Sequence, residues 1–234
     1  MAKSKPDART YSARGDTLIS RQPVVLTRYR AFTRCNHWLT AVCMFALLLS
    51  GFAFFHPSLY GLTALFGGGQ VARWIHPWIG VVLALSFLGM FVQMWRLNLP
   101  NRDDVEWGKK AGHALRGNGD QLPEVGKYNA GQKAVFWGMS LSILLLLGTG
   151  LMIWEQYFAQ FISIPVQRVA VVVHALSALA SFFLVLAHVY AAIWTRGTIR
   201  AMTRGTVTGG WAFRHHRKWL RELAQRAGRI TTEK

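Results

Sequence analysis

VQRVAVVVHALSALASFFLVLAHVYAAIW, at residues 166–194, is an apolar stretch that contains two histidines, His174 and His188. A helix needs about 20 apolar residues to cross a hydrocarbon core of roughly 30 Å, so this stretch predicts a transmembrane helix. The histidines are 14 residues apart. In an α-helix this spacing is a rise of about 21 Å and a rotation about 40° short of whole turns, which places both on one face. Because ionisable side chains are costly inside a membrane, both histidines are candidate functional residues.

Three further apolar stretches of similar length lie earlier in the chain, and 52% of the residues are hydrophobic while only 16% are charged. This composition is not that of an ordinary soluble protein. The stretches run from Asn36 to Phe55, from Ile75 to Trp95 and from Lys133 to Ile153. We therefore expect an all-α membrane protein built on a bundle of four transmembrane helices.

The 27 lysines and arginines are distributed unevenly around the four predicted helices. Eight precede the first helix, seven lie in the middle loop and ten follow the fourth helix, whereas the two remaining loops hold one each, Arg73 and Arg168. Cytoplasmic segments carry the excess of basic residues. Both termini and the middle loop are therefore predicted to be cytoplasmic, in a bacterial inner membrane. Topology thus accounts for the net charge of +17, and no nucleic acid is expected as a partner.

Three regions are predicted along the chain. Residues 1–27, rich in Ser, Pro, Asp and Arg, are expected to form a disordered cytoplasmic extension. Residues 28–209 form the four-helix domain, and residues 210–234 form a basic cytoplasmic tail. In this tail Trp211, Trp219, Leu220 and Leu223 stand among arginines. Such a pattern is typical either of a helix at the lipid headgroups or of a solvated basic segment.

Topology also predicts which histidines of the four helices face each other. His37 lies at the cytoplasmic start of the first helix and His76 at the outer start of the second. The fourth helix runs inward, so His174 lies in the outer leaflet and His188 in the inner one. Depth therefore pairs His76 with His174 and His37 with His188. Two facing imidazoles in a bundle core are suitable axial ligands for a haem iron, so we expect two b-type haems.

Two arginines stand one helical turn before predicted ligands. Arg34 precedes His37 by three residues and Arg73 precedes His76 by three. Each could hold a haem propionate in a charge-assisted pair, or could be an ordinary charge at the membrane boundary.

The helices also contain small residues, which could let helices or a porphyrin approach closely, although plain helix packing explains them equally well. They are Ser50, Gly51, Gly80, Gly138, Gly148 and Gly150.

From about Arg30 to Arg221 the chain resembles the gamma, cytochrome b subunit of membrane-bound respiratory formate dehydrogenase. Besides the paired histidines, the resemblance is carried by several short motifs. These are Arg34 with Asn36-His37-Trp38, His76-Pro77, Asn101-Arg102-Asp103-Asp104, Tyr128-Asn129-x-Gly131-Gln132-Lys133, and His215-His216 before Trp219.

The resemblance implies the same ligand pairs: His76 with His174 for an outer haem, and His37 with His188 for an inner one. It also implies a quinone site beside the inner haem, with contacts from Asn129, the backbone at Gly131, and His188 close by. Free N–H groups at a helix start can bind a quinone carbonyl. Asn129 is equally suited to cap that helix.

The resemblance further implies the partners. An iron–sulfur beta subunit would deliver electrons from a molybdenum- or tungsten-containing catalytic alpha subunit, and this chain would pass them to menaquinone or ubiquinone. A higher oligomer of the heterotrimer is left open. No residue of this chain is expected to oxidise formate itself.

Three rival functions are compatible with parts of the pattern. The chain could be the cytochrome b of a hydrogenase or of another periplasmic reductase, although the motifs from Asn101 to Lys133 argue against this. It could be a transporter that uses the intramembrane histidines as a relay. A haem-free membrane anchor is disfavoured by four inward histidines.

Overall fold

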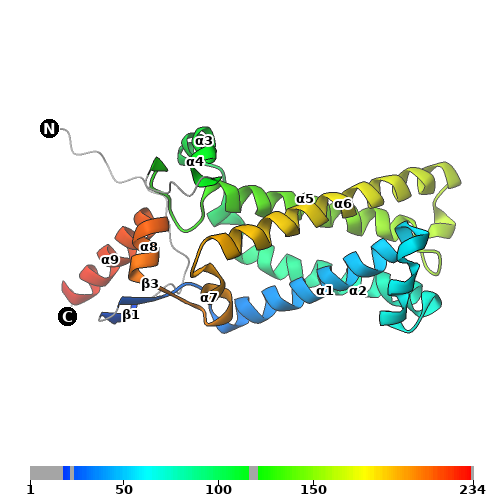
Figure 1. The fold of residues 1–234 in the computed structure, drawn as a ribbon, viewed down its shortest axis with the longest axis horizontal. Coiled ribbons are helices and arrows are strands. Elements are labelled where there is room, and N and C mark those ends of the chain that lie inside the picture. The colour runs from blue at the N-terminus through cyan, green and yellow to red at the C-terminus, as the bar shows by residue number, and fades with distance from the viewer. Residues whose placement is uncertain (1–17, 22–23, 116–120, 233–234) are drawn as a thin grey trace. The chain divides into compact units, whose positions relative to one another are not determined.

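The computed structural model describes residues 18–21, 24–115 and 121–232 of the chain. Within this part, four helices are long and apolar enough to cross a membrane (Figure 1). They are α1 (Ala31–Phe55), α2 (Gly69–Met94), α5 (Ala130–Met152) and α6 (Ile164–Trp194). The four predicted helices are thus confirmed. α1 and α2 begin five and six residues before the predicted starts, because the polar first turns of these helices extend beyond the apolar stretch from which they were predicted.

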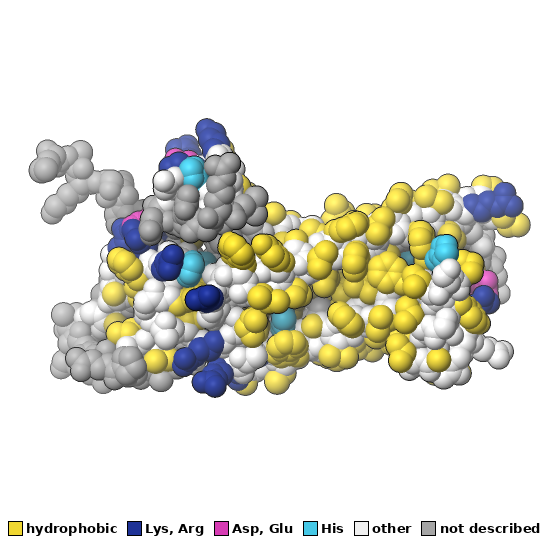
Figure 2. All heavy atoms as spheres, in the orientation of Figure 1, with side chains coloured by type: hydrophobic (Ala, Val, Ile, Leu, Met, Phe, Trp, Pro, Cys, Tyr) yellow, Lys and Arg dark blue, Asp and Glu magenta, His cyan; other side chains and the backbone are white. Residues whose placement is uncertain are grey.

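These four helices form one unit, residues 32–93 and 134–195. Its core includes Cys43 and Met44 of α1, Leu83 of α2 and Ile143 of α5, with Val185 of α6 packed against them. Large apolar side chains cover the outside of this unit, as Figure 2 shows. Such an exterior suits lipid, because the bilayer core offers no partner for polar groups. Cys43 is buried in this core, whereas Cys35 is exposed.

A polar network joins α1 to α2 inside this unit. The Asn36 amide donates to the carbonyl of Ser86 at 2.8 Å, and the Ser86 hydroxyl donates back to Asn36 Oδ1 at 2.8 Å. Thr40 Oγ1 lies 2.7 Å from Ser86 Oγ. Gly89 leaves room for this amide, because a Cβ there would stand 3.3 Å from Asn36 Nδ2. The contacts satisfy the polar groups internally, as a membrane interior requires.

Short 3-10 helices form the connections within the same unit. Between α1 and α2 lies η1 (Pro57–Phe66), and between α5 and α6 lies η4 (Ala159–Phe161). The ring of His56 accepts a hydrogen bond from the Ser58 N–H and so caps η1. Gly67 ends η1 with a φ of 85°, a conformation that favours glycine. His56 is therefore a capping residue.

The second unit comprises residues 1–31, 94–133 and 196–234. Its described part holds a three-stranded antiparallel sheet in the order β1-β2-β3, in which Leu26 pairs with Val207. The strands are β1 (Leu18–Arg21), β2 (Val24–Thr27) and β3 (Thr206–Thr208). The helices are η2 (Trp95–Asn98), α3 (Arg102–Lys109), α4 (Ala111–Leu115), α7 (Thr198–Thr203), α8 (Gly209–His215) and α9 (Arg217–Thr232).

Strands β1 and β2 correct the prediction that residues 1–27 are disordered. That prediction came from the polar composition of the whole segment. Leu26, however, is buried in the sheet opposite Val207, which lies far away in the sequence. Residues 1–17 and 22–23 lie outside the described residues.

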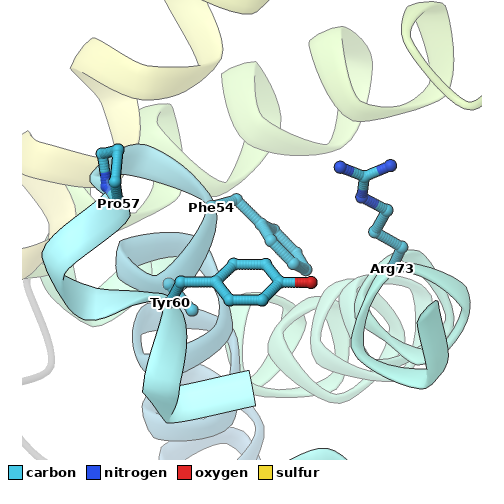
Figure 3. Close-up of a pocket in the computed structure, with 5 residues that line it drawn as sticks. Phe54, Pro57, Tyr60 and Arg73 are labelled. Carbon is cyan, nitrogen blue, oxygen red and sulfur yellow. The ribbon is translucent and has the colours of Figure 1, made fainter. Parts of the chain in front are cut away.

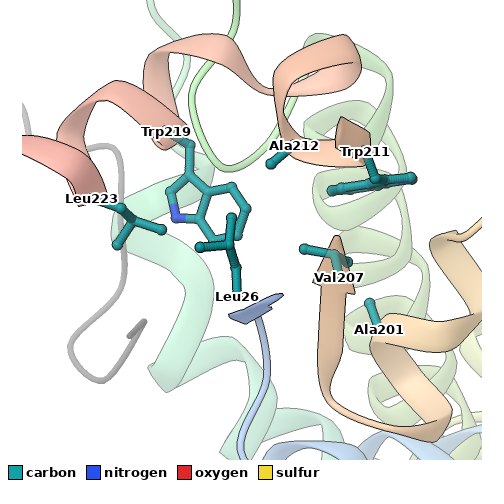
Figure 4. Close-up of a cluster of buried hydrophobic side chains, with 7 residues drawn as sticks. All are labelled: Leu26, Ala201, Val207, Trp211, Ala212, Trp219 and Leu223. Carbon is teal, nitrogen blue, oxygen red and sulfur yellow. The ribbon is translucent and has the colours of Figure 1, made fainter. Parts of the chain in front are cut away.

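The basic tail is helical, and several of its large apolar side chains are buried, although Phe213 is exposed. Trp211 of α8 and Trp219 and Leu223 of α9 are buried with Leu26 and Val207 in one cluster (Figure 4). Neither alternative for the tail describes this arrangement, since both left these side chains in contact with lipid or water. The apolar side chains instead bind the tail to the sheet.

Next to this cluster lie two buried cations, Arg28 and Lys127. Each donates to the other's carbonyl oxygen, and the Arg28 guanidinium lies 4.8 Å from the Trp211 ring centre and 5.0 Å from that of Trp219. Cation–π contact of this kind partly offsets the loss of water around the charge. His216 completes the group, because its Nδ1 donates to Gly126 O at 2.7 Å and its Nε2 accepts from Arg28 Nη2 at 3.3 Å.

We predict that this unit loses stability in mild acid because of His216. Burial and the neighbouring Arg28 guanidinium hold the pKa of His216 well below its usual value. The unfolded histidine binds a proton near pH 6.5, whereas the folded one does not, so unfolding becomes easier as the pH falls below about 6.5. One such group contributes at most about 1.4 kcal/mol per pH unit. The measurement is hydrogen exchange at the β2 and β3 amides of the full chain in detergent.

The control for this prediction is His216→Gln, which removes the titrating group. Its opening free energy should start lower but fall less steeply between pH 7.5 and 5.5. Equal pH slopes in the two proteins would contradict the assignment.

Candidate functional site

The four intramembrane histidines lie in two facing pairs within the four-helix unit. His37 of α1 faces His188 of α6, with ring centres 6.2 Å apart. His76 of α2 faces His174 of α6, with ring centres 6.4 Å apart. The structure therefore brings together the same partners that the depth argument pairs.

The ring separation fits a metal ion between each pair. A metal–imidazole bond is about 2 Å long and the ligating nitrogen lies about 1 Å from the ring centre, so two axial imidazoles should have centres about 6 Å apart. Both observed separations are close to this value. Two imidazoles are also the donor set of a six-coordinate haem iron.

Hydrogen bonds determine the tautomers of the outer pair. His76 Nδ1 lies 2.7 Å from Ser50 Oγ, and His174 Nδ1 lies 2.9 Å from Thr149 Oγ1. Each hydroxyl donates its single proton to a backbone carbonyl, Ser50 to Ala46 at 2.9 Å and Thr149 to Leu145 at 2.6 Å. The hydroxyls must then accept from the imidazoles. The proton is on Nδ1 in both rings, which leaves Nε2 free to ligate a metal.

The inner pair lacks such partners. His37 Nδ1 is buried, and the described residues provide no hydrogen-bond partner for it. The His188 ring is exposed on α6 and faces His37 as closely as the outer rings face each other.

Two of the predicted small residues lie against the outer rings. A Cβ at Gly150 would stand 3.3 Å from His174 Cε1, and one at Gly51 would stand 3.9 Å from His76 Cε1. Gly150 therefore permits a close approach that alanine would crowd. Gly138 serves helix packing instead, since a Cβ there would meet the Leu184 side chain at 3.1 Å.

Arg73 lines a cavity of about 390 Å³ in the same unit, together with Ala53, Phe54, Pro57 and Tyr60. Figure 3 shows the Phe54 and Tyr60 rings reaching toward the helix that carries Arg73. Phe54 also contacts the His76 ring at 5.8 Å between centres. A cation in a cavity beside the outer pair fits an anionic group such as a propionate. Arg34, one turn before His37, is half-buried on α1.

Asn129 and Gly131, predicted to contact a quinone, lie at the start of α5 in the other unit. Asn129 caps the helix: its N–H donates to Gln132 Oε1 at 3.0 Å, and its Oδ1 accepts from the Gln132 N–H at 2.9 Å. Gly131 lies under Trp107, because a Cβ there would stand 3.2 Å from Trp107 Cη2. Nearby, buried Lys133 forms an ion pair with Asp104 at 2.8 Å. The capping alternative is thus correct for Asn129 Oδ1, while its Nδ2 donor has no hydrogen bond to a described residue.

The whole pattern of facing histidines in a four-helix unit agrees with the comparisons to known proteins. Residues 28–205 match the family described as prokaryotic cytochrome b561. The chain belongs to this family. Cytochromes b561 carry b-type haem, and the imidazole pairs of this family member fit that group in both donor type and spacing.

Among curated proteins, this cytochrome b561 is similar to subunits of formate dehydrogenases. It is 43% identical over 209 residues to the cytochrome b556(fdo) subunit of Escherichia coli K12, covering 89% of this chain and 96% of that protein. It is 40% identical to the cytochrome b556 subunit of Haemophilus influenzae, covering 84% and 83%. It is 36% identical to the nitrate-inducible cytochrome b556(Fdn) subunit of Escherichia coli K12, covering 89% and 96%.

The sequence reasoning did not find the hydroxyl partners of the outer ligands or the indole over Gly131. It treated Ser50 only as a small packing residue and did not single out Thr149 or Trp107. A hydroxyl residue within an apolar helix is a weak signal for a polar contact. The histidine that such a hydroxyl contacts depends on how the helices of this cytochrome b561 are rotated in the bundle.

Proposed function

We propose that this chain is the dihaem cytochrome b subunit of a formate dehydrogenase complex and carries electrons from an outer to an inner haem. The observation that carries the proposal is the two facing pairs, His76 with His174 and His37 with His188. The similarity to formate dehydrogenase subunits is the reason for proposing formate as the source of the electrons.

The route across the membrane follows from the positions of the ligands on α6. His174 and His188 are separated by a rise of about 21 Å, so the two sites lie in opposite leaflets. A bound b-haem supplies reversible one-electron chemistry at each site. The paired histidines would ligate each haem iron, while Arg73 and Arg34 would hold propionates. The apolar helices keep water away from both sites.

The direction of transfer follows from topology. The excess of lysine and arginine puts both termini in the cytoplasm of a bacterial inner membrane. The outer pair then receives electrons from an iron–sulfur beta subunit, which takes them from the molybdenum- or tungsten-containing alpha subunit. This chain contributes electron transfer and quinone reduction to the complex, which can assemble further into an oligomer of heterotrimers.

The electron acceptor in this proposal is menaquinone or ubiquinone, reduced at the cytoplasmic end. Asn129 Nδ2 and the free N–H groups of the first turn of α5, including Gly131, are the donors for a quinone carbonyl. Trp107 flanks these donors through its contact with Gly131. His188, the third residue that the resemblance assigns to the quinone, lies in the four-helix unit, and its role rests on that resemblance.

A second candidate shares the haem sites but takes electrons from a hydrogenase or another periplasmic reductase. The family alone allows it, whereas the formate dehydrogenase relatives favour formate as the source. Identifying the subunits that co-purify with the chain separates these two donors. A histidine-relay transporter would show no α-band of b-haem on reduction.

We predict two b-haems per chain with separable ligands. His76→Ala or His174→Ala should remove the outer haem and keep the inner one, while His37→Ala or His188→Ala should do the reverse, because each iron needs both imidazoles. A pyridine haemochrome assay gives the stoichiometry, and reduced-minus-oxidised spectra identify the haem that remains. His113→Ala, outside the membrane helices, is the control. One haem or none in the unaltered chain would refute the proposal.

We also predict that Asn129→Ser weakens quinone binding without unfolding the start of α5. Serine is an equally good N-cap, so it keeps the acceptor for the Gln132 N–H but removes the amide donor. Losing one neutral hydrogen bond costs about 0.5 to 1.5 kcal/mol, so the apparent KM for a quinone analogue should rise several-fold. Haem reduction by the donor should be unchanged in stopped-flow measurements.

Asn129→Ala is the comparison variant, because it removes both the donor and the cap. It should raise KM at least as much and should also speed hydrogen exchange in the first turn of α5. Unchanged quinone kinetics in Asn129→Ser would place the donor elsewhere.

A further inference from the structure

We propose that Ser50 and Thr149 lower the reduction potential of the outer site below that of the inner site, so that electrons move downhill toward the cytoplasm. This inference rests on the proposed function, since it assumes a haem at each histidine pair. It assigns a role to two hydroxyl residues that do not themselves reach a haem iron.

The two hydroxyls are held rigidly as acceptors. Ser50 is fully buried and donates to Ala46 O, while Thr149 is also buried and donates to Leu145 O. Each hydroxyl proton is thus committed to the helix backbone. The oxygen lone pairs point at Nδ1 of His76 and His174, at 2.7 and 2.9 Å. Both ligands of the outer site therefore donate a short hydrogen bond through Nδ1.

A hydrogen bond at Nδ1 changes the electron density of the ligand. When an acceptor pulls on the Nδ1 proton, the imidazole becomes a more basic ligand at Nε2. A more basic axial ligand stabilises the ferric iron more than the ferrous iron, and this lowers the reduction potential. Ser50 and Thr149 each accept from Nδ1 of one imidazole of the same pair, so their effects have the same sign.

The inner site has the opposite arrangement. His37 Nδ1 is buried and has no hydrogen-bond partner among the described residues. The His37 imidazole is then a weaker electron donor than the outer imidazoles, which favours the ferrous state. Each transfer moves one electron, so the outer site is oxidised as the inner site is reduced. The Nδ1 protons of the outer pair stay in place, and no proton transfer is needed.

The test is a potentiometric titration of both haems in the purified complex, with Thr149→Val compared with Thr149→Ser. Valine matches threonine in shape but lacks the acceptor, whereas serine keeps it. In Thr149→Val the outer potential should rise, because the ferric state loses one hydrogen bond. We expect a ferrous-to-ferric ratio about two- to tenfold higher at a given potential. A tenfold change corresponds to about 59 mV for one electron.

Ser50→Ala gives an independent measurement from the other ligand and should shift the outer potential in the same direction. Ser140→Ala is the matched control, because the Ser140 hydroxyl on α5 donates to Phe136 O at 2.8 Å and is not hydrogen-bonded to a histidine. It should leave both potentials unchanged. The inner haem should keep its potential in every variant, and Thr149→Ser should retain the unaltered value.

Several results would overturn the inference. Unchanged potentials in both Thr149→Val and Ser50→Ala would do so, as would equal shifts of both haems. Loss of the outer haem from both variants would mean that the hydroxyls retain the ligands rather than tune them. The pyridine haemochrome assay on the unaltered protein separates this failure from that of the proposed function. Two haems with unmoved potentials leave the proposed function standing.

Discussion

The facing of imidazoles between α6 and its neighbours α1 and α2 is the constraint on which the four-helix unit depends. Helix α6 supplies one histidine to each pair, and α1 and α2 supply the partners at ring separations of 6.2 and 6.4 Å. These distances suit two ligands with a metal between them. Helices α1 and α2 must therefore each lie at the distance from α6 that brings the paired rings together. The remaining helix packing must be compatible with these two distances. Gly150 shows the consequence, since its missing side chain makes room for the His174 ring.

The four-helix unit distributes its residues in the reverse of the pattern found in soluble proteins, as expected for a unit surrounded by lipid. Apolar side chains lie outside, and the polar groups inside find partners within the bundle. Asn36, Thr40 and Ser86 bond one another, while Ser50 and Thr149 bond the outer ligands. His37 Nδ1 differs, since it is buried and no described residue bonds to it. In our proposal this difference between the pairs tunes their potentials, because a hydrogen bond to a ligating imidazole changes the electron density at the metal.

The second unit is held together by a different principle. Its sheet is short, and its stability comes from long-range contacts that join the two ends of the chain: Leu26 with Val207 and Trp219, and Arg28 with His216. Burying two cations is costly. Carbonyl oxygens and indole faces offset that cost around Arg28. His216 bonds to the Gly126 carbonyl, and Lys127 donates to the Arg28 carbonyl. These contacts fix the segment just before the capped start of α5, where the proposed quinone donors lie.

The sequence by itself determined the four apolar helices, and it predicted their orientation in the membrane and which histidines share a depth. These properties depend on hydrophobic length, on charge asymmetry and on a fixed rise per residue, all of which are local or imposed by the bilayer. Tertiary structure alone decided that Ser50 and Thr149 meet the outer ligands, that Trp107 covers Gly131 and that β2 pairs with β3. Ser50 and His76 are 26 residues apart, and Val25 and Thr208 pair across most of the chain. Such contacts depend on helix rotation and on long-range burial, which no local pattern of residues specifies.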